Sequence, residues 1–172
     1  MGDPGLTAAQ RENLEIIDRS GSHLLVLIND VLEMSKIEAG RAALFEQSFD
    51  LHNMLDDLES MFGLRAEGKG LHLVMKRAPD VPVYVRTDES KLRQVLINLL
   101  GNAVKFTEEG QVTLRVAYDE EDGGPRLRFE IRDTGPGIDA TELEKLFDPF
   151  VQTRSGQTMQ EGTGLGLPIS RE

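Results

Sequence analysis

Asn98-Leu-Leu-Gly-Asn102-Ala-Val-Lys105 is the stretch of sequence on which the rest of the chain depends, within a segment that begins at Asp88. At roughly 100° per residue, a helix places Gln94, Asn98, Asn102 and Lys105 on one side. The adjacent stripe is apolar and comprises Leu92, Val95, Leu96, Leu99, Ala103 and Phe106. Two carboxamides one turn apart, followed by a lysine, can offer oxygen ligands and a cation to a metal-bound phosphate chain. The segment is therefore predicted to be a helix with one core face and one polar site.

Composition bounds the class of protein. The 172 residues, 39% of them hydrophobic, are enough for one ordinary core plus an appendage. The absence of cysteine excludes disulfides, thiolate zinc sites and a cysteine nucleophile, and favours a reducing compartment. A formal charge of −11 argues against a general nucleic-acid binder and means that an anionic ligand would need a metal. We expect no membrane contact, because no apolar run approaches the ~20 residues of a membrane span.

The N-terminal part has a helical pattern with apolar or small residues at alternating spacings of three and four. These positions are Leu14, Ile17, Gly21, Leu24, Ile28, Val31 and Ser35. The pattern predicts one helix from about Leu6 to Ala39, with Gly40 as its C′ residue. No second long helix is predicted to cover this stripe, and its heptad character favours self-association into a homodimer. The alternative is that the helix packs on its own domain.

The middle of the chain alternates between helical and strand patterns. Asp50 is predicted to cap a helix that the glycines at 68 and 70 end, and Asp88 to cap the helix that carries Asn98. Two long alternating segments joined by residues 120–125 predict an antiparallel hairpin with one solvent-facing side. The predicted strands lie in residues 41–49, 71–75, 83–86, 111–118 and 126–132. Helices and antiparallel strands in this order predict an α+β two-layer sandwich preceded by one long α-helix.

Two glycine-rich segments follow the hairpin. The first, residues 133–138, places the Asp133 carboxylate at a strand end, before glycines that let the backbone approach a flat ligand. Taken alone, this loose pattern favours a plain turn. A short helix over residues 140–146 and the pair Phe147-Asp-Pro-Phe150, which also suits a core, precede a polar loop over residues 151–161. The second glycine segment, residues 162–167, opens a helix whose free N–H groups and dipole favour phosphate.

Taken together, these segments predict an adenine nucleotide site, although neither a P-loop nor a Rossmann fingerprint occurs. In order and spacing they resemble the ATP-binding domain of sensor histidine kinases, within the Bergerat-fold ATPases, over nearly the whole chain. Asn98-xxx-Asn102-Ala-x-Lys105-Phe-Thr resembles the N box and Phe147-Asp-Pro-Phe150 the F box. Residues 133–138 and 162–167 resemble the first and second glycine boxes.

The resemblance implies a role for each matching residue. Asn102 would hold the Mg²⁺ that bridges the ATP phosphates, with Asn98 in or near that shell, and Lys105 would neutralise phosphate charge. Asp133 would accept a hydrogen bond from the adenine amine. The remaining nucleotide-binding residues would be Gly135, Gly137, Ile138, Phe150, Gly162, Thr163, Gly164, Leu165, Gly166 and Leu167. Residues 151–161 would form the ATP lid, and their one cation, Arg154, would reach the γ-phosphate as a catalytic residue.

One departure from hydrolysing relatives concerns the reaction. Gyrase-type and chaperone-type relatives carry a glutamate where this chain has Asn98, and an amide cannot activate water as a carboxylate can. The site therefore suits phosphoryl transfer to a nucleophile, which in a histidine kinase is an imidazole nitrogen. Two alternatives remain open, namely a hydrolysing ATPase that uses an acid elsewhere, and a non-catalytic dimerisation or nucleotide-sensing module.

The resemblance also implies a domain organisation. Residues 1–40 resemble the second helix of the dimerisation and phosphotransfer hairpin, residues 41–172 the ATP-binding domain, with a hinge near residues 40–43. We expect a fragment truncated at both ends, because the phosphoacceptor helix would lie upstream and two strands would follow Glu172. His23, His52 and His72 are expected to be structural or surface residues, so the fragment would bind Mg-ATP without labelling itself. The parent protein would be cytoplasmic or membrane-anchored and would phosphorylate a response-regulator receiver domain.

Overall fold

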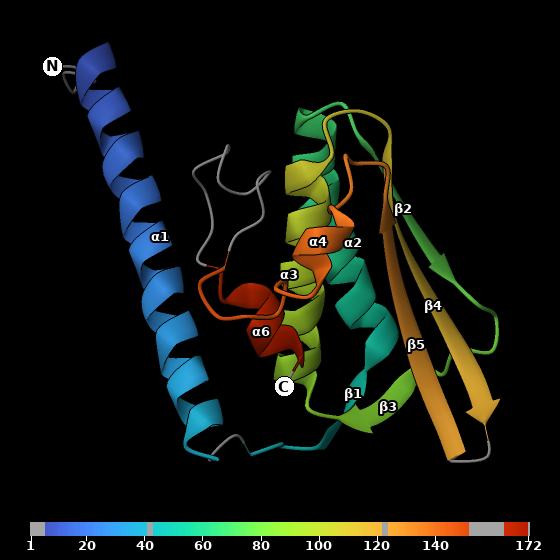
Figure 1. Ribbon diagram of the computed structural model, residues 1–172. Helices are drawn as coiled ribbons and strands as arrows, with labels where there is room; N and C mark the ends of the chain where they lie inside the picture. The colour runs from blue at the N-terminus through green and yellow to red at the C-terminus, as the bar shows by residue number, and fades with distance from the viewer. Residues whose placement is uncertain (1–5, 41–42, 122–123, 152–163, 172) are drawn as a thin grey trace, which may run out of the picture. The chain divides into compact units, whose positions relative to one another are not determined.

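The computed structural model describes residues 6–40, 43–121, 124–151 and 164–171. The chain divides into two compact units, Met1–Ala42 and Ala43–Glu172, and each is described by itself (Figure 1). In the described part of the chain, no helix combines the length and apolarity that crossing a membrane requires.

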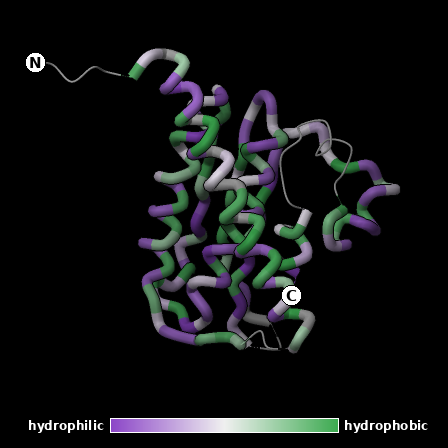
Figure 2. Tube along the Cα trace, turned by 90° about the vertical axis from the view of Figure 1, so that its left-hand side faces the viewer, coloured by the Kyte–Doolittle hydropathy of each residue, from purple (hydrophilic) through white to green (hydrophobic). Residues whose placement is uncertain are grey.

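The first unit is the single helix α1, Ala8–Glu38. Thr7 begins it with a capping box, in which its hydroxyl accepts from the Gln10 N–H and the Gln10 side chain accepts from the Thr7 N–H. Gly40 follows the last turn with a φ of 63°, the left-handed conformation that glycine adopts readily. The predicted long helix is confirmed. Hydrophobic residues recur along it (Figure 2), and many of the large ones are exposed, among them Leu14, Ile17, Leu24, Leu25, Ile28 and Leu32.

The second unit is a two-layer α/β sandwich, as predicted (Figure 1). Its helical layer contains α2 and α3, and its sheet has the strand order β2-β4-β5, beside a two-stranded sheet of β1 and β3. The bounds are β1 Gln47–Asp50, α2 Leu51–Gly68, β2 His72–Arg77, β3 Tyr84–Thr87, α3 Glu89–Phe106, β4 Gln111–Glu121, β5 Gly124–Asp133, α4 Ala140–Leu143 and α6 Gly166–Arg171. Apolar side chains of α2, α3 and β4 form the core between the layers, including Leu55, Leu58, Phe62, Leu96, Leu100, Val112 and Leu114.

Strand pairing differs from the prediction in one place. The hairpin β4–β5 is antiparallel as expected, with Val112 opposite Asp133. However, β2 pairs with β4 in parallel, with His72 opposite Gln111, so the expectation of antiparallel strands is wrong for this pair. The reason is connectivity, because the chain passes through β3 and α3 between them and returns to the end at which β2 began.

The helix after the first glycine segment is also shorter than predicted. Helix α4 ends at Leu143 instead of Leu146. Beyond it, the N–H groups of Lys145, Leu146 and Asp148 bond to carbonyls three residues earlier, which is the pattern of successive turns and not of an α-helix.

The buried carboxylate of Asp88 begins α3, the helix that carries the predicted site. It accepts hydrogen bonds from the Ser90 hydroxyl at 2.7 Å, the Phe45 N–H at 2.9 Å and the Lys91 N–H at 3.1 Å. These donors, the Ser90 hydroxyl first, hold the pKa of Asp88 at about 2. Because Phe45 lies just after residue 42, this cap also ties the start of the second unit to α3.

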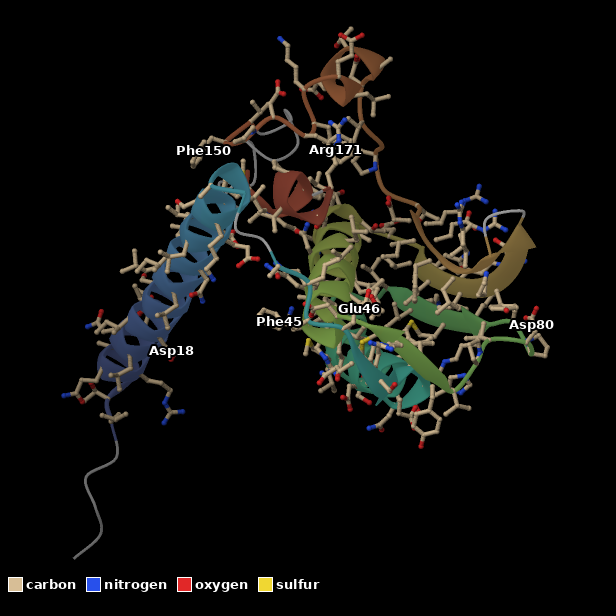
Figure 3. All side chains as sticks on the ribbon, turned by 90° about the horizontal axis from the view of Figure 1, so that it is seen from below. Asp18, Phe45, Glu46, Asp80, Phe150 and Arg171 are labelled. Atoms are coloured by element: carbon tan, nitrogen blue, oxygen red, sulfur yellow. The ribbon has the colours of Figure 1, made fainter. Side chains whose placement is uncertain are left out.

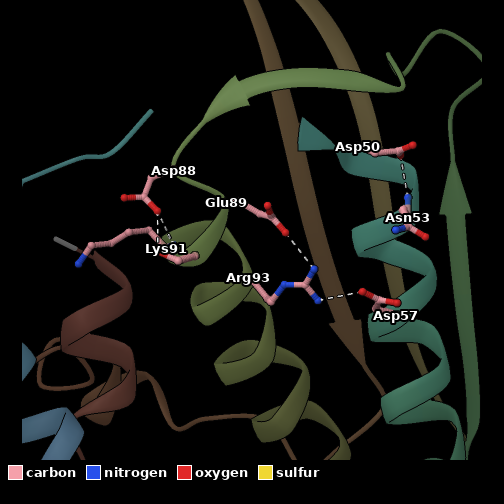
Figure 4. A network of polar contacts seen from close by, with 8 residues as sticks. Asp50, Asn53, Asp57, Asp88, Glu89, Lys91 and Arg93 are labelled. Atoms are coloured by element: carbon pink, nitrogen blue, oxygen red, sulfur yellow. Dashed lines mark hydrogen bonds and ion pairs between the residues drawn. The ribbon is translucent and has the colours of Figure 1, made fainter. Parts of the chain in front are cut away.

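One turn later, Arg93 connects α3 with α2. Its guanidinium bonds to Glu89 at 3.0 Å and to Asp57 on α2 at 3.3 Å (Figure 4). The hydrogen bond to Glu89, followed by that to Asp57, raises the pKa of Arg93. The N-terminal end of α3 is therefore held to Phe45, near the start of the second unit, by Asp88 and to α2 by Arg93.

The Asp88 cap predicts a specific acid sensitivity. The folded-state pKa of about 2 lies below the ordinary aspartate value of about 3.9, so the cap contributes stability above pH ~4 and loses it as the pH falls towards 2. Asp88→Asn, which can still cap the helix, should lower the urea midpoint at pH 6 and flatten its decline between pH 4 and 2. Asp80→Asn, in an exposed turn, is the control. Parallel pH profiles for wild type and Asp88→Asn would contradict the assignment.

Candidate functional site

The polar face of α3 meets the second glycine segment at α6. The Asn102 amide N–H donates to Asn98 Oδ1 at 3.4 Å, and the Asn98 amide N–H donates to Ser170 Oγ at 2.8 Å. Ser170 Oγ in turn donates to the Gly166 carbonyl at 2.8 Å. A Cβ atom at position 166 would overlap the Asn98 amide, so only glycine permits this approach. The fold thus joins two predicted motifs that lie far apart in the sequence.

The described residues on either side of positions 152–163 are bonded to each other. The Phe150 N–H donates to the Gly164 carbonyl at 3.0 Å. Both residues have left-handed backbone conformations, with φ of 65° and 70°, which is unusual for a phenylalanine. A Cβ on Gly164 would lie within 2.9–3.1 Å of backbone atoms of Phe150 and Val151. Arg154, Gly162 and Thr163, and most of the predicted lid, lie outside the described residues.

The F-box motif contacts α6 through its first aromatic residue. The Arg171 guanidinium lies 5.2 Å from the centre of the Phe147 ring, a cation–π distance. Figure 3 labels Arg171 and also Phe150, whose N–H bonds to the Gly164 carbonyl. Sequence reasoning did not include Arg171 or Ser170, because their roles depend on residues that are distant in the sequence.

The first glycine segment packs against the C-terminal end of α3. Asp133 Oδ1 accepts the Gly135 N–H at 2.9 Å. A Cβ on Gly135 would lie 3.2 Å from the Phe106 carbonyl oxygen and 3.4 Å from Thr107 Oγ1, so the two backbones nearly touch. Asp133 and Ile138 are exposed, and Gly137 has a φ of 74°.

A threonine that sequence reasoning overlooked secures this segment. Thr134 Oγ1 accepts from the Gln111 N–H at 3.0 Å and donates to the Glu109 carbonyl at 3.0 Å. Thr134 therefore ties the end of β5 to the turn between α3 and β4. A threonine directly after a strand-terminal aspartate would have been the signal for such a link.

The predicted site residues thus form two groups at α3. Asn98, Asn102 and Gly166 form the first group, whereas Asp133 and Gly135 lie at the end of the helix in the second. Among the described residues, no hydrogen bond joins Asn102 to Asp133 directly. The Lys105 ammonium, one turn from Asn102, lies 4.9 Å from the centre of the Phe106 ring. A ligand that contacts both groups would have to be elongated, with one end at each.

The oxygen atoms of this site fit a hydrated, phosphate-bound metal. In the described ranges, no group of three or more His, Asp or Glu side chains could hold a metal ion. The half-buried Asn102 uses its amide nitrogen for Asn98, and its oxygen accepts no hydrogen bond within the described part. Mg²⁺ commonly takes one or two protein oxygens, with water and substrate phosphates completing its shell. Asn102 therefore suits Mg²⁺ that arrives with a nucleotide.

Comparison with known proteins identifies the relatives of this chain. The aerobic respiration control sensor protein ArcB of Escherichia coli (strain K12) is 42% identical over 171 residues, covering 98% of this chain and 22% of ArcB. Hybrid signal transduction histidine kinase B of Dictyostelium discoideum is 40% identical over 168 residues, covering 96% and 8%. The crystal structure of full-length ShkA in complex with AMPPNP superposes with a TM-score of 0.77 at 38% identity, covering 96% and 33%.

The chain thus spans less than a quarter of the length of these two curated relatives. Residues 87–172, half of the chain, match the family described as histidine kinase-, DNA gyrase B-, and HSP90-like ATPase. This range begins at the N-terminal end of α3 and contains both groups of predicted site residues. The chain therefore belongs to this ATPase family and is close to histidine kinase catalytic domains.

Proposed function

We propose that this chain binds Mg-ATP as part of a hybrid sensor histidine kinase in the cytoplasm, where ATP is available. In the parent protein, the γ-phosphate would pass to a histidine and then to an aspartate of a response-regulator receiver domain. The observation that carries the proposal is the series of hydrogen bonds that runs from Asn102 to Asn98, from Asn98 to Ser170 and from Ser170 to the Gly166 carbonyl. The ShkA complex supports it, because its ligand AMPPNP is an ATP analogue.

The two groups of site residues suit the two ends of ATP. At the adenine end, Asp133 would accept a hydrogen bond from the exocyclic amine through Oδ2, because Oδ1 already accepts the Gly135 N–H. Gly135, Gly137 and Ile138 would lie beside the base. At the phosphate end, Lys105 would supply positive charge, with Arg154 of the lid at the γ-phosphate. The backbone of residues 162–167 and Phe150 would enclose the phosphates.

Asn102 would hold the magnesium ion, which neutralises phosphate charge when it is bound. Asn98 would lie near that shell and position it, because its amide already bonds to Asn102 and Ser170. Neither amide can take a proton from water, so the site is suited to positioning and charge stabilisation. Transfer therefore requires a separate nucleophile.

The second unit offers no histidine that we assign to this role. His52 Nε2 bonds to the Val81 carbonyl at 3.2 Å, which fixes α2 to the loop before β3. His72 is exposed at the start of β2. Because His23 is likewise expected to be a structural or surface residue, we propose that this chain does not phosphorylate itself.

Calorimetry with AMPPNP and Mg²⁺ tests nucleotide binding, and we expect one molecule bound per chain. No binding would overturn the proposed function. Incubation with γ-labelled ATP should leave no acid-labile, base-stable label on this chain. Such a label would contradict the assignment of the histidines.

The apolar stripe of α1 leads us to propose a homodimer through this helix. Ile28 is exposed in the single chain, as is its polar neighbour Asn29. If the stripe is the interface, Ile28→Glu should weaken dimerisation at least about tenfold, because each protomer loses a buried side chain and gains a charge. Asn29→Glu adds the same charge beside the stripe and is the control. Analytical ultracentrifugation measures both, and a monomeric wild type would refute the dimer.

A further inference from the structure

Lys69 lies where α2 ends. Gly70, with a φ of 71°, closes a Schellman motif in which its own N–H bonds to the Glu67 carbonyl and the Leu71 N–H bonds to the Ala66 carbonyl, each at 2.9 Å. This motif makes Lys69 the C-cap of α2. The sequence predicted only that the glycines end the helix, whereas the structure also shows where they direct the lysine side chain.

The Lys69 ammonium binds the end of another helix, α3. It donates to the carbonyls of Lys105 at 2.7 Å, Val104 at 2.9 Å and Thr107 at 3.2 Å. Backbone carbonyls at a helix C-terminus have no partner within the helix, and the helix dipole makes that end attractive to cations. An ammonium has three donors and no acceptor, so three converging carbonyls match it.

The other two carbonyls of this last turn, those of Ala103 and Phe106, have other neighbours. The Ala103 carbonyl accepts the Thr107 N–H and the Thr107 hydroxyl. The Phe106 carbonyl faces Gly135 of the first glycine segment. Lys69 therefore holds three of the five carbonyls from residue 103 to residue 107.

This turn connects the two groups of site residues. Lys105 lies on it, Asn102 directly precedes it, and its backbone beyond Lys105 is the surface against which Gly135 packs. We propose that Lys69 is a positioning residue for the nucleotide site, which sets the α3 C-terminal turn so that the phosphate end and the adenine end keep their spacing. This inference rests on the proposed binding of ATP.

The first test compares Lys69→Met with wild type. The variant retains the apolar stem and loses the ammonium, so α3 keeps its core contacts while its last turn loses three hydrogen bonds. Calorimetry with Mg-AMPPNP, well below the unfolding temperature, should show about tenfold weaker binding, the change expected from losing a charge-assisted hydrogen bond. Lys76→Met, at an exposed lysine of β2, should bind as wild type does.

The absence of cysteine permits a second, sharper test. Lys69→Cys introduces one reactive thiol, which 2-bromoethylamine converts to an ammonium-bearing lysine analogue and 1-bromopropane to a neutral side chain of the same length. Affinity should return with the ammonium and not with the propyl group. If Lys69 acted only as an apolar spacer, the aminoethylated and the propylated protein would both regain wild-type affinity.

The outcomes separate the two proposals. If wild type binds no nucleotide, the proposed function fails. If wild type binds and Lys69→Met or the propylated protein binds equally well, the positioning role is wrong. If Lys69→Met does not fold, Lys69→Arg replaces it in the test, because arginine keeps the positive charge. Its guanidinium keeps the positive charge and supplies N–H donors to the carbonyls, so an affinity above that of propylated Lys69→Cys is expected, and an affinity no higher than that of the propylated protein would refute the inference.

Discussion

Asn102→Ala is expected to lower the affinity for Mg-AMPPNP by about a hundredfold or more, because it removes the protein oxygen that we assign to the magnesium ion. The same change removes the amide that bonds to Asn98 at 3.4 Å, but it leaves the Asn98–Ser170 bond intact. The second glycine segment should therefore stay in place, and the loss should be confined to the metal-dependent part of binding.

Calorimetry in Mg²⁺ and in EDTA separates these parts. Wild type should bind much more weakly in EDTA, whereas Asn102→Ala should bind equally weakly in both. Asn53→Ala is the matched control, because Asn53 is exposed on α2 and its backbone N–H, which the substitution keeps, bonds to Asp50 (Figure 4). A variant at position 102 that retains the full gain from Mg²⁺ would show that another residue holds the metal.

Gly164→Ala is expected to have the second large effect, with nucleotide binding lost and α6 released from its position. A left-handed φ of 70° costs a non-glycine residue about 1–2 kcal/mol. Here the added Cβ would also lie within 2.9–3.1 Å of the backbone of Phe150 and Val151, which cannot rotate away as a side chain can. The Phe150–Gly164 hydrogen bond and the helix that follows should both be disturbed.

Hydrogen exchange and calorimetry measure this effect. The Ile169 N–H, which bonds to the Leu165 carbonyl at 3.0 Å, should lose its protection in Gly164→Ala. Gly40→Ala is the control that has the backbone strain without the steric overlap. Gly40 has a similar φ of 63°, but no atom lies within 4 Å of the added Cβ. Unchanged protection of Ile169 together with wild-type nucleotide affinity would contradict the role that we give to Gly164.

The sequence by itself determined the features that depend on local chemistry. Apolar periodicity predicted α1 and α3, because residues three or four positions apart in the sequence lie on the same face of a helix. Asp50 and Asp88 predicted helix starts, since their side chains accept N–H groups three residues ahead. The order of Asn102, Asp133 and the second glycine segment predicted the family, which the match over residues 87–172 confirms.

Only the tertiary structure decided which distant residues meet. It paired β2 in parallel with β4, placed Ser170 against Asn98, and brought Lys69 to the carbonyls that end α3. A local sequence pattern predicts the periodicity of a helix or strand and the residues that cap it, because these features depend on neighbours a few positions away. Contacts between residues 36 or 72 positions apart, such as Lys69–Lys105 and Asn98–Ser170, arise only when the helices pack and leave carbonyl and amide groups facing each other.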